Sequence, residues 1–190
     1  MSDTIDRLTR IVPPPGSPTG KDGSSHRQDL GFSLPEDYER LVEIYGGSRW
    51  DDYLYILEPG CPNSHYDMVT WEREQSEILE EDWQFEEKPA QLRPKGSRLV
   101  PWATTDNGEV LFWLLLPGQA PEDWTVMIRE ARGEGWEHFR MGCVDFLVAA
   151  LTGEVRSEIL SSRFPLAEHR VEPLSIPHAP ARNLSHRTRP

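Results

Sequence analysis

One loop of the chain brings together three residue types that cysteine hydrolases use. Cys61, His65 and Asp67 all fall in the segment CPNSHYDM. A thiol becomes a strong nucleophile where a neighbouring imidazole accepts its proton. Three such residues in a loop are common, however, and no signature of a cysteine enzyme surrounds these. The other cysteine, Cys143, falls in an apolar helical segment, so we expect no enzyme activity from either thiol.

Metal and phosphate chemistry have no better support. His65, Asp67 and His138 do not have the spacing of a metal motif such as HExxH. The segments GGS and TDNG lack the lysine pattern of a phosphate-binding loop. We therefore predict a protein that is not an enzyme, with no metal, no cofactor and no small-molecule substrate.

The segment PWATTDNGEVLFWLLL, residues 101–116, raises a second possibility. Asp106 and Asn107 could bind an ion or a ligand. Apolar runs flank them on both sides, however, and Asp-Asn-Gly is typical of a tight turn between two strands. We therefore predict a hairpin turn here, and we expect Trp102 and Trp113, which alternate along the two strands, to lie in the core.

The elements that must position these residues follow from the apolar periodicity. Leu34, Tyr38, Leu41, Val42 and Tyr45 form one helical stripe, which Gly46 and Gly47 end. The order is helix, strand, helix, three or four strands in a meander, and helix. This order predicts an α+β fold: a single domain with a mostly antiparallel sheet of about five strands and helices packed on one face. The expected strands are 53–57, 98–104, 109–116, 124–130 and 135–139, and the expected helices are 34–45, 70–88 and 141–152.

The two ends of the chain differ from its middle in composition. Residues 1–29 are rich in Pro, Gly and Ser, and residues 163–190 are rich in Pro, Arg and His. Such segments bury too little apolar surface to offset the entropy of ordering them. We predict a disordered leader, a domain at 30–162 and a disordered basic tail. No secretory signal and no apolar run of membrane-spanning length is present, which favours a soluble cytoplasmic protein with no membrane partner.

The charge of the chain limits its partners. The formal net charge is −12, although the segment from Arg163 onward carries five Arg against two Glu, so the acidity belongs to the domain. Binding of nucleic acid depends mostly on Lys and Arg that neutralise phosphates. We therefore expect no nucleic-acid binding beyond a weak contact of the tail through Arg182, Arg187 and Arg189, and we predict a basic protein partner.

Acidic and aromatic residues in predicted loops and on a predicted helix are the candidate contacts. Carboxylates steer a basic partner, and exposed aromatic residues anchor it. An acidic helix face is also common for solubility alone, and this alternative stays open. Trp124 is a further candidate for an exposed aromatic residue. The predicted partner-binding residues are Trp50, Asp51, Asp52, Glu58, Glu77, Glu80, Glu81, Asp82, Trp83, Glu86 and Glu87.

Three segments in this order resemble one known family. LPEDYERLVEIYGGSRWDDYLYILEP, PWATTDNGEVLFWLL and WEHFRMGCVDFLVAALTGE are similar to the SUKH superfamily of bacterial immunity proteins and cell-wall regulators, over about residues 30–155. The resemblance implies a binding module without catalysis. Many members are immunity proteins that silence a polymorphic toxin, often a nuclease or a deaminase, whereas others are scaffolds or regulators. An immunity protein is the expectation here, and a regulatory or scaffold adaptor is the alternative.

Overall fold

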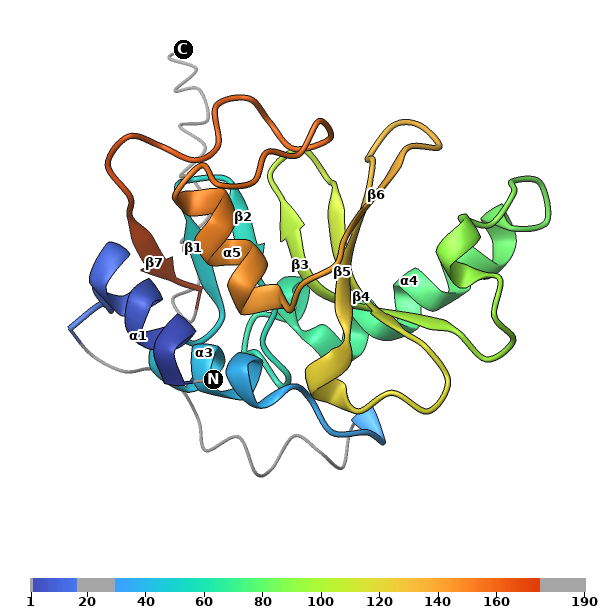
Figure 1. The fold of residues 1–190 in the computed structure, drawn as a ribbon, viewed down its shortest axis with the longest axis horizontal. Coiled ribbons are helices and arrows are strands. Elements are labelled where there is room, and N and C mark those ends of the chain that lie inside the picture. Colours follow the sequence, from blue (N-terminus) through green and yellow to red (C-terminus); the bar gives the residue numbers. More distant parts are fainter. Residues whose placement is uncertain (1, 17–29, 175–190) are drawn as a thin grey trace, which may run out of the picture.

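The computed structural model describes residues 2–16 and 30–174, which fold into an α+β domain (Figure 1). Short 3-10 turns connect several of the elements. The helices are α1 (Ser2–Ile11), α3 (Glu36–Tyr45), α4 (Met68–Asp82) and α5 (Cys143–Leu151); the strands are β1 (Ser48–Trp50), β2 (Leu54–Ile56), β3 (Arg98–Thr105), β4 (Val110–Leu115), β5 (Thr125–Arg129), β6 (Trp136–Phe139) and β7 (Val171–Pro173).

Within residues 2–16 and 30–174 the strands form one antiparallel sheet of seven strands in the order β6-β5-β4-β3-β2-β1-β7. The predicted meander is confirmed as β3 to β6. The count exceeds the expected five because β1, which precedes the expected strand 53–57, forms a hairpin with β2 across the turn at Asp51 and Asp52, and because β7 comes from the predicted tail. The predicted turn at residues 106–108 is confirmed, with Gly108 at φ 95° and its N–H donating to the Thr105 carbonyl at 3.1 Å.

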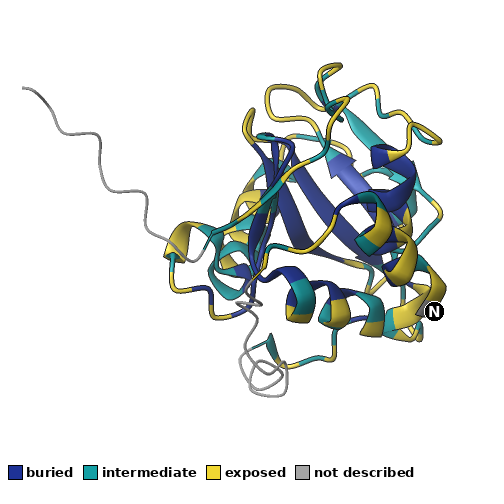
Figure 2. Ribbon diagram, turned by 90° about the vertical axis from the view of Figure 1, so that its left-hand side faces the viewer, coloured by how far each residue is buried: buried dark blue, intermediate teal, exposed yellow. Residues whose placement is uncertain are grey.

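Both faces of the sheet are covered, so the prediction that the helices pack on one face is wrong. Along β4 the side chains alternate: Leu111 and Trp113 join α1, α3 and α5 in the main core, whereas Phe112 packs with Leu79 of α4 on the opposite face. Figure 2 shows the buried strands inside and the exposed residues on the outer sides of the helices and in the loops. The helix α4 lies at the opposite end of the molecule from α1 (Figure 1).

The prediction of a disordered leader is wrong for residues 2–16. Ile5, Leu8 and Val12 are buried in the main core, where α1 packs against α3 and α5. The hydroxyl of Tyr45 donates to the carbonyl of Val12 at 2.6 Å and fixes the end of this segment. Apolar spacings of three and four are the signal for this helix, which the proline-rich continuation obscures. Residues 17–29 of the predicted leader lie outside the described residues.

The prediction of a disordered tail is wrong for residues 163–174. Leu166 and Arg170 hydrogen-bond to the β1–β2 turn, and β7 pairs with β1 at the edge of the sheet. The rest of the tail, residues 175–190 with Arg182, Arg187 and Arg189, lies outside the described residues. Within the described part of the chain, no helix has the length and apolarity needed to cross a membrane.

Candidate functional site

Trp50, a predicted anchor for a partner, is a core residue. Its side chain has no exposed surface and lies against Tyr45, with ring centroids 4.8 Å apart. The indole N–H donates to the hydroxyl of Ser48 at 2.9 Å, so its only polar atom is satisfied inside the fold. The prediction that Trp50 contacts a partner is therefore wrong. Trp124 is also buried, since it packs against Trp113 at 5.8 Å.

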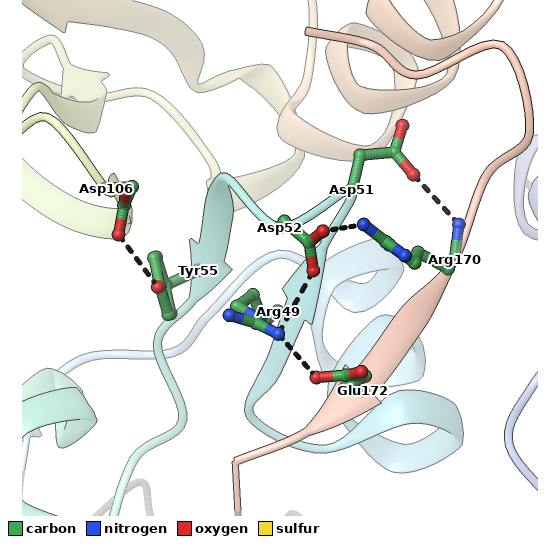
Figure 3. Close-up of polar contacts among 7 residues, drawn as sticks. All are labelled: Arg49, Asp51, Asp52, Tyr55, Asp106, Arg170 and Glu172. Carbon is green, nitrogen blue, oxygen red and sulfur yellow. Dashed lines mark hydrogen bonds and ion pairs between the residues drawn. The ribbon is translucent and has the colours of Figure 1, made fainter.

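The acids next to Trp50 bind the chain itself. The carboxylate of Asp51 is buried and accepts hydrogen bonds from residues 166–170. Asp52 forms ion pairs with Arg49, at 3.0 Å, and with Arg170 (Figure 3). Both side chains thus hold the C-terminal segment against the sheet. Because both carboxylates already bind residues of the same chain, they are not part of the candidate surface.

Glu58 has a structural role at the end of β2. It is 5% exposed, and its Oε2 accepts the backbone N–H of Gly47 at 2.9 Å. A Cβ added at Gly47 would approach this side chain to 3.1 Å, so the two residues fit closely. Glu58 is therefore excluded from a partner surface by its burial.

The C-terminal end of α4 is tied to the sheet by a cation. Arg129 of β5 binds the carboxylate of Asp82 and lies 3.8 Å from that of Glu86. Its guanidinium also lies 5.7 Å from the ring centroid of Trp136. Trp83 is half-buried, and Lys88 covers its ring at 4.2 Å. Three predicted contacts, Asp82, Trp83 and Glu86, therefore interact with Arg129 or Lys88 within the chain and help to hold the C-terminal end of α4 in place.

Four of the predicted residues remain exposed, in the same segment as two exposed apolar side chains. Phe85 is 90% exposed and Ile78 is 43% exposed, and these are the large hydrophobic side chains that the described residues expose. Positions 78, 81 and 85 recur at three and four residues, so they share one face of α4 and of the turn that continues it. We define the α4 surface as Glu77, Ile78, Glu80, Glu81, Phe85 and Glu87.

The carboxylates of the α4 surface make no ion pair or side-chain hydrogen bond with any residue that the structure describes. The helix itself is firmly placed: Asp67 caps its first turn, accepting from Thr70 N at 3.1 Å and from Thr70 Oγ1 at 2.7 Å. The N–H of Phe85 donates to the Asp82 carbonyl at 2.9 Å, which extends the helical turn beyond α4. The surface is therefore helical and acidic, with an exposed aromatic ring and carboxylates that have no partner among the described residues.

The thiols do not form a nucleophilic site. Cys61 is buried, and Asp67 uses its carboxylate as the helix cap and to accept the N–H of Gly60 at 2.8 Å. Burial, and next the charge of Asp37, raise the pKa of the Cys143 thiol well above its usual value, so this thiol stays protonated. Across residues 2–16 and 30–174, no three His, Cys, Asp or Glu side chains gather where they could hold a metal ion.

The Asp-Asn-Gly turn is also satisfied internally. Asp106 accepts a hydrogen bond from the hydroxyl of Tyr55 at 3.2 Å (Figure 3). Glu109 accepts from the hydroxyls of Tyr53, at 3.0 Å, and Thr105. These bonds hold the hairpin to β2, which agrees with a turn that belongs to the fold.

Comparisons of the chain with protein-family models, with curated proteins and with solved structures found no significant match. The candidate site consequently rests on the geometry of α4. Phe85 and Ile78 are the residues that the sequence analysis missed. The signal for them is weak, since Trp83 and Phe85 stand two positions apart in the same acidic segment and only the packing decides which ring is covered.

Proposed function

We propose that this chain is a non-catalytic protein-binding module whose α4 surface binds a basic protein. One observation carries the proposal: Phe85 is 90% exposed, in a segment whose exposed carboxylates have no ion-pair partner in the described structure. Interfaces use exposed aromatic rings as anchors, and Phe85 has a second exposed apolar side chain, Ile78, in the same segment. The carboxylates around it favour a cationic partner and accelerate its association.

We further propose that the partner is the toxic domain of a polymorphic toxin, of nuclease or deaminase type, and that the chain is its immunity protein in the bacterial cytoplasm. A nuclease presents Lys and Arg to bind phosphates, so an acidic surface can occupy that site and exclude the substrate. The resemblance of residues 30–155 to the SUKH superfamily supports this role. The charge of the α4 surface supports it independently.

The test starts from the partner that co-purifies with the tagged full chain from its native host. We expect one basic protein, identified by mass spectrometry, whose nuclease or deaminase activity stops when the purified chain is added at equal concentration. A partner whose activity the chain leaves unchanged would make the chain a regulatory or scaffold adaptor. Several unrelated partners that bind through other surfaces would overturn the proposal.

A further inference from the structure

The last described segment, residues 166–174, is held by one buried carboxylate. Asp51 has no exposed side-chain surface. Its Oδ1 accepts the N–H of Arg170 at 2.9 Å, and its Oδ2 accepts the N–H of Leu166 at 3.1 Å and is 2.8 Å from Nδ1 of His169. We call residues 166–174 the strap. Asp51 therefore holds residues 166–170 of the strap, which precede β7.

The turn that carries Asp51 has a left-handed backbone at both of its central residues. Asp51 and Asp52 have φ of 50° and 56°, and the N–H of Tyr53 donates to the carbonyl of Trp50 at 3.0 Å. This is the hairpin turn for which Asn-Gly and Asp-Gly are preferred, because most residues other than Gly, Asn and Asp are strained at positive φ. An Asn at position 51 would suit the turn but would offer one acceptor oxygen. Both oxygens of Asp51 are used, so the strap explains why this position holds Asp and not Asn, both of which suit the turn.

The second half of the strap is held by exposed ion pairs. Arg49 of β1 lies 2.7 Å from Glu172 and 3.0 Å from Asp52, and Asp52 also binds Arg170 (Figure 3). These side chains are between 28% and 56% exposed. Ion pairs at that exposure contribute little and are screened by salt.

The strap has weak apolar anchoring: Val171 packs against the main core but is only partly buried. The apolar side chains of the strap are at most half-buried, whereas Leu160, just before it in the chain, is buried. When the strap detaches, Asp51 becomes hydrated, so no unpaired charge stays buried. Segments with few buried apolar contacts open locally at a lower free energy than the whole domain.

Opening of the strap would uncover a strand edge. The strap pairs with β1 in antiparallel register, with Arg49 opposite Glu172. The carbonyl of Gly47 accepts the N–H of Leu174 at 2.8 Å, and the N–H of Asp51 donates to the carbonyl of Arg170 at 2.9 Å. Free groups of this kind along a strand edge bind an added strand.

A small cavity lies beside the same edge. It has a volume of about 220 Å³, and Arg49, Tyr55 and Tyr66 line it together with Glu172. The two tyrosine rings are stacked, with centroids 5.0 Å apart. A strand that replaces the strap would lie beside the guanidinium of Arg49 and the stacked rings of Tyr55 and Tyr66.

We propose that the strap is a detachable edge strand, and that the β1 edge beneath it binds an extended antiparallel peptide with a carboxylate opposite Arg49. The strap itself is the template for this occupant: it places Glu172 against Arg49 and Arg170 against Asp52. The site goes beyond the proposed function, since it is built from β1 and its hairpin and shares no residue with the α4 surface.

Hydrogen exchange of the full chain, followed by mass spectrometry, tests the detachment. In the wild type we expect the amides of residues 166–174 to exchange at least tenfold faster than those of β3 to β5. Asp51→Asn suits the turn and removes one acceptor oxygen. It should therefore increase the exchange rate of the strap amides at least tenfold further and leave the exchange rates of β3 to β5 unchanged. Strap amides that exchange at the rate of β3 to β5 in the wild type would overturn the proposal.

A binding experiment tests the docking site. The probe is a fluorescent peptide with the sequence of residues 166–174, LAEHRVEPL, and the target is the full chain with Arg170→Ala and Glu172→Ala, which weaken the resident strap and leave β1 intact. We expect saturable binding at least tenfold tighter than to the wild type. The same peptide with Lys in place of its second Glu should lose at least tenfold in affinity. A peptide that does not bind the variant, or that binds equally with either residue, would overturn the docking site.

Discussion

Arg129 of β5 and Asp82 at the end of α4 form an ion pair between the sheet and the helix that carries the α4 surface. The guanidinium is 14% exposed, and it also lies over Trp136. The pair therefore positions the C-terminal end of α4, and with it Phe85, which follows Asp82 by three residues.

Arg129→Met should destabilise the fold by about 1–2 kcal/mol, because it removes a partly buried ion pair and leaves Asp82 and Glu86 without their cation. Urea unfolding of the two proteins measures this difference. Arg132→Met, at an exposed position without a described ion pair, is the control and should change stability by less than about 0.5 kcal/mol. Equal stabilities of the Arg129 variant and the control would show that the pair contributes nothing.

Phe85→Ala should leave stability unchanged within about 0.5 kcal/mol, because its ring is exposed. The same change should weaken binding of the basic partner by about 2 kcal/mol or more, as expected for an aromatic anchor. The control is Phe112→Ala, which removes a fully buried ring and should cost about 3–5 kcal/mol of stability. Thermal unfolding and calorimetric titration give the two quantities, and unchanged affinity of Phe85→Ala would contradict its role.

Leu8→Ala should cost about 2–5 kcal/mol, because this side chain of α1 is fully buried in the main core. Arg10→Ala on the exposed side of α1 is the matched control and should change stability by less than about 0.5 kcal/mol. Denaturant unfolding measures both. If Leu8→Ala behaved like the control, α1 would not be part of the folded domain.

Tyr45 should make stability fall in alkaline solution. Burial raises the pKa of Tyr45 to about 12. Because the pKa is raised by folding, the neutral phenol stabilises the fold fully below the unfolded pKa of about 10, and this contribution is lost as the pH rises toward 12.

Tyr45→Phe isolates this effect. At pH 8 the variant lacks the hydrogen bond to Val12 and should be less stable by about 1 kcal/mol. The wild type should lose this advantage by about pH 11, since one pH unit above the unfolded pKa corresponds to about 1.4 kcal/mol. Denaturant unfolding of both proteins from pH 8 to 11 measures this loss. A difference in the free energy of unfolding between the wild type and Tyr45→Phe that stays constant across this range would contradict the raised pKa of Tyr45.

Local patterns predict the elements of this fold where they contain complete signals. The stripe of α3 is confirmed, since Tyr38, Leu41, Val42 and Tyr45 are all buried. The hairpin at Gly108 is confirmed for the same reason, because turn chemistry is local. The strap could not be predicted, since its stability depends on donors that meet Asp51 from more than 100 positions along the chain.

The candidate site was predicted only in part, and the reason is also physical. The residue type indicates charge, but not whether a partner inside the chain already uses that charge. Asp51 and Glu58 are buried and bonded, whereas Glu80 and Glu81 have the same chemistry and stay exposed. Trp124 is covered by neighbouring rings, and Phe85 is left open by the end of α4. Exposure of this kind is set by tertiary packing.

The central claim is that the α4 surface binds a basic partner. The most direct measurement is the Kd of the purified partner for the chain with Glu77→Lys, Glu80→Lys and Glu81→Lys, compared with a control that carries Asp123→Lys, Glu130→Lys and Glu134→Lys at other exposed positions. Both variants change the net charge equally. We predict that the first weakens binding at least a hundredfold and the control less than fivefold, with a steeper loss at low salt. Equal affinities of the two variants would contradict the account.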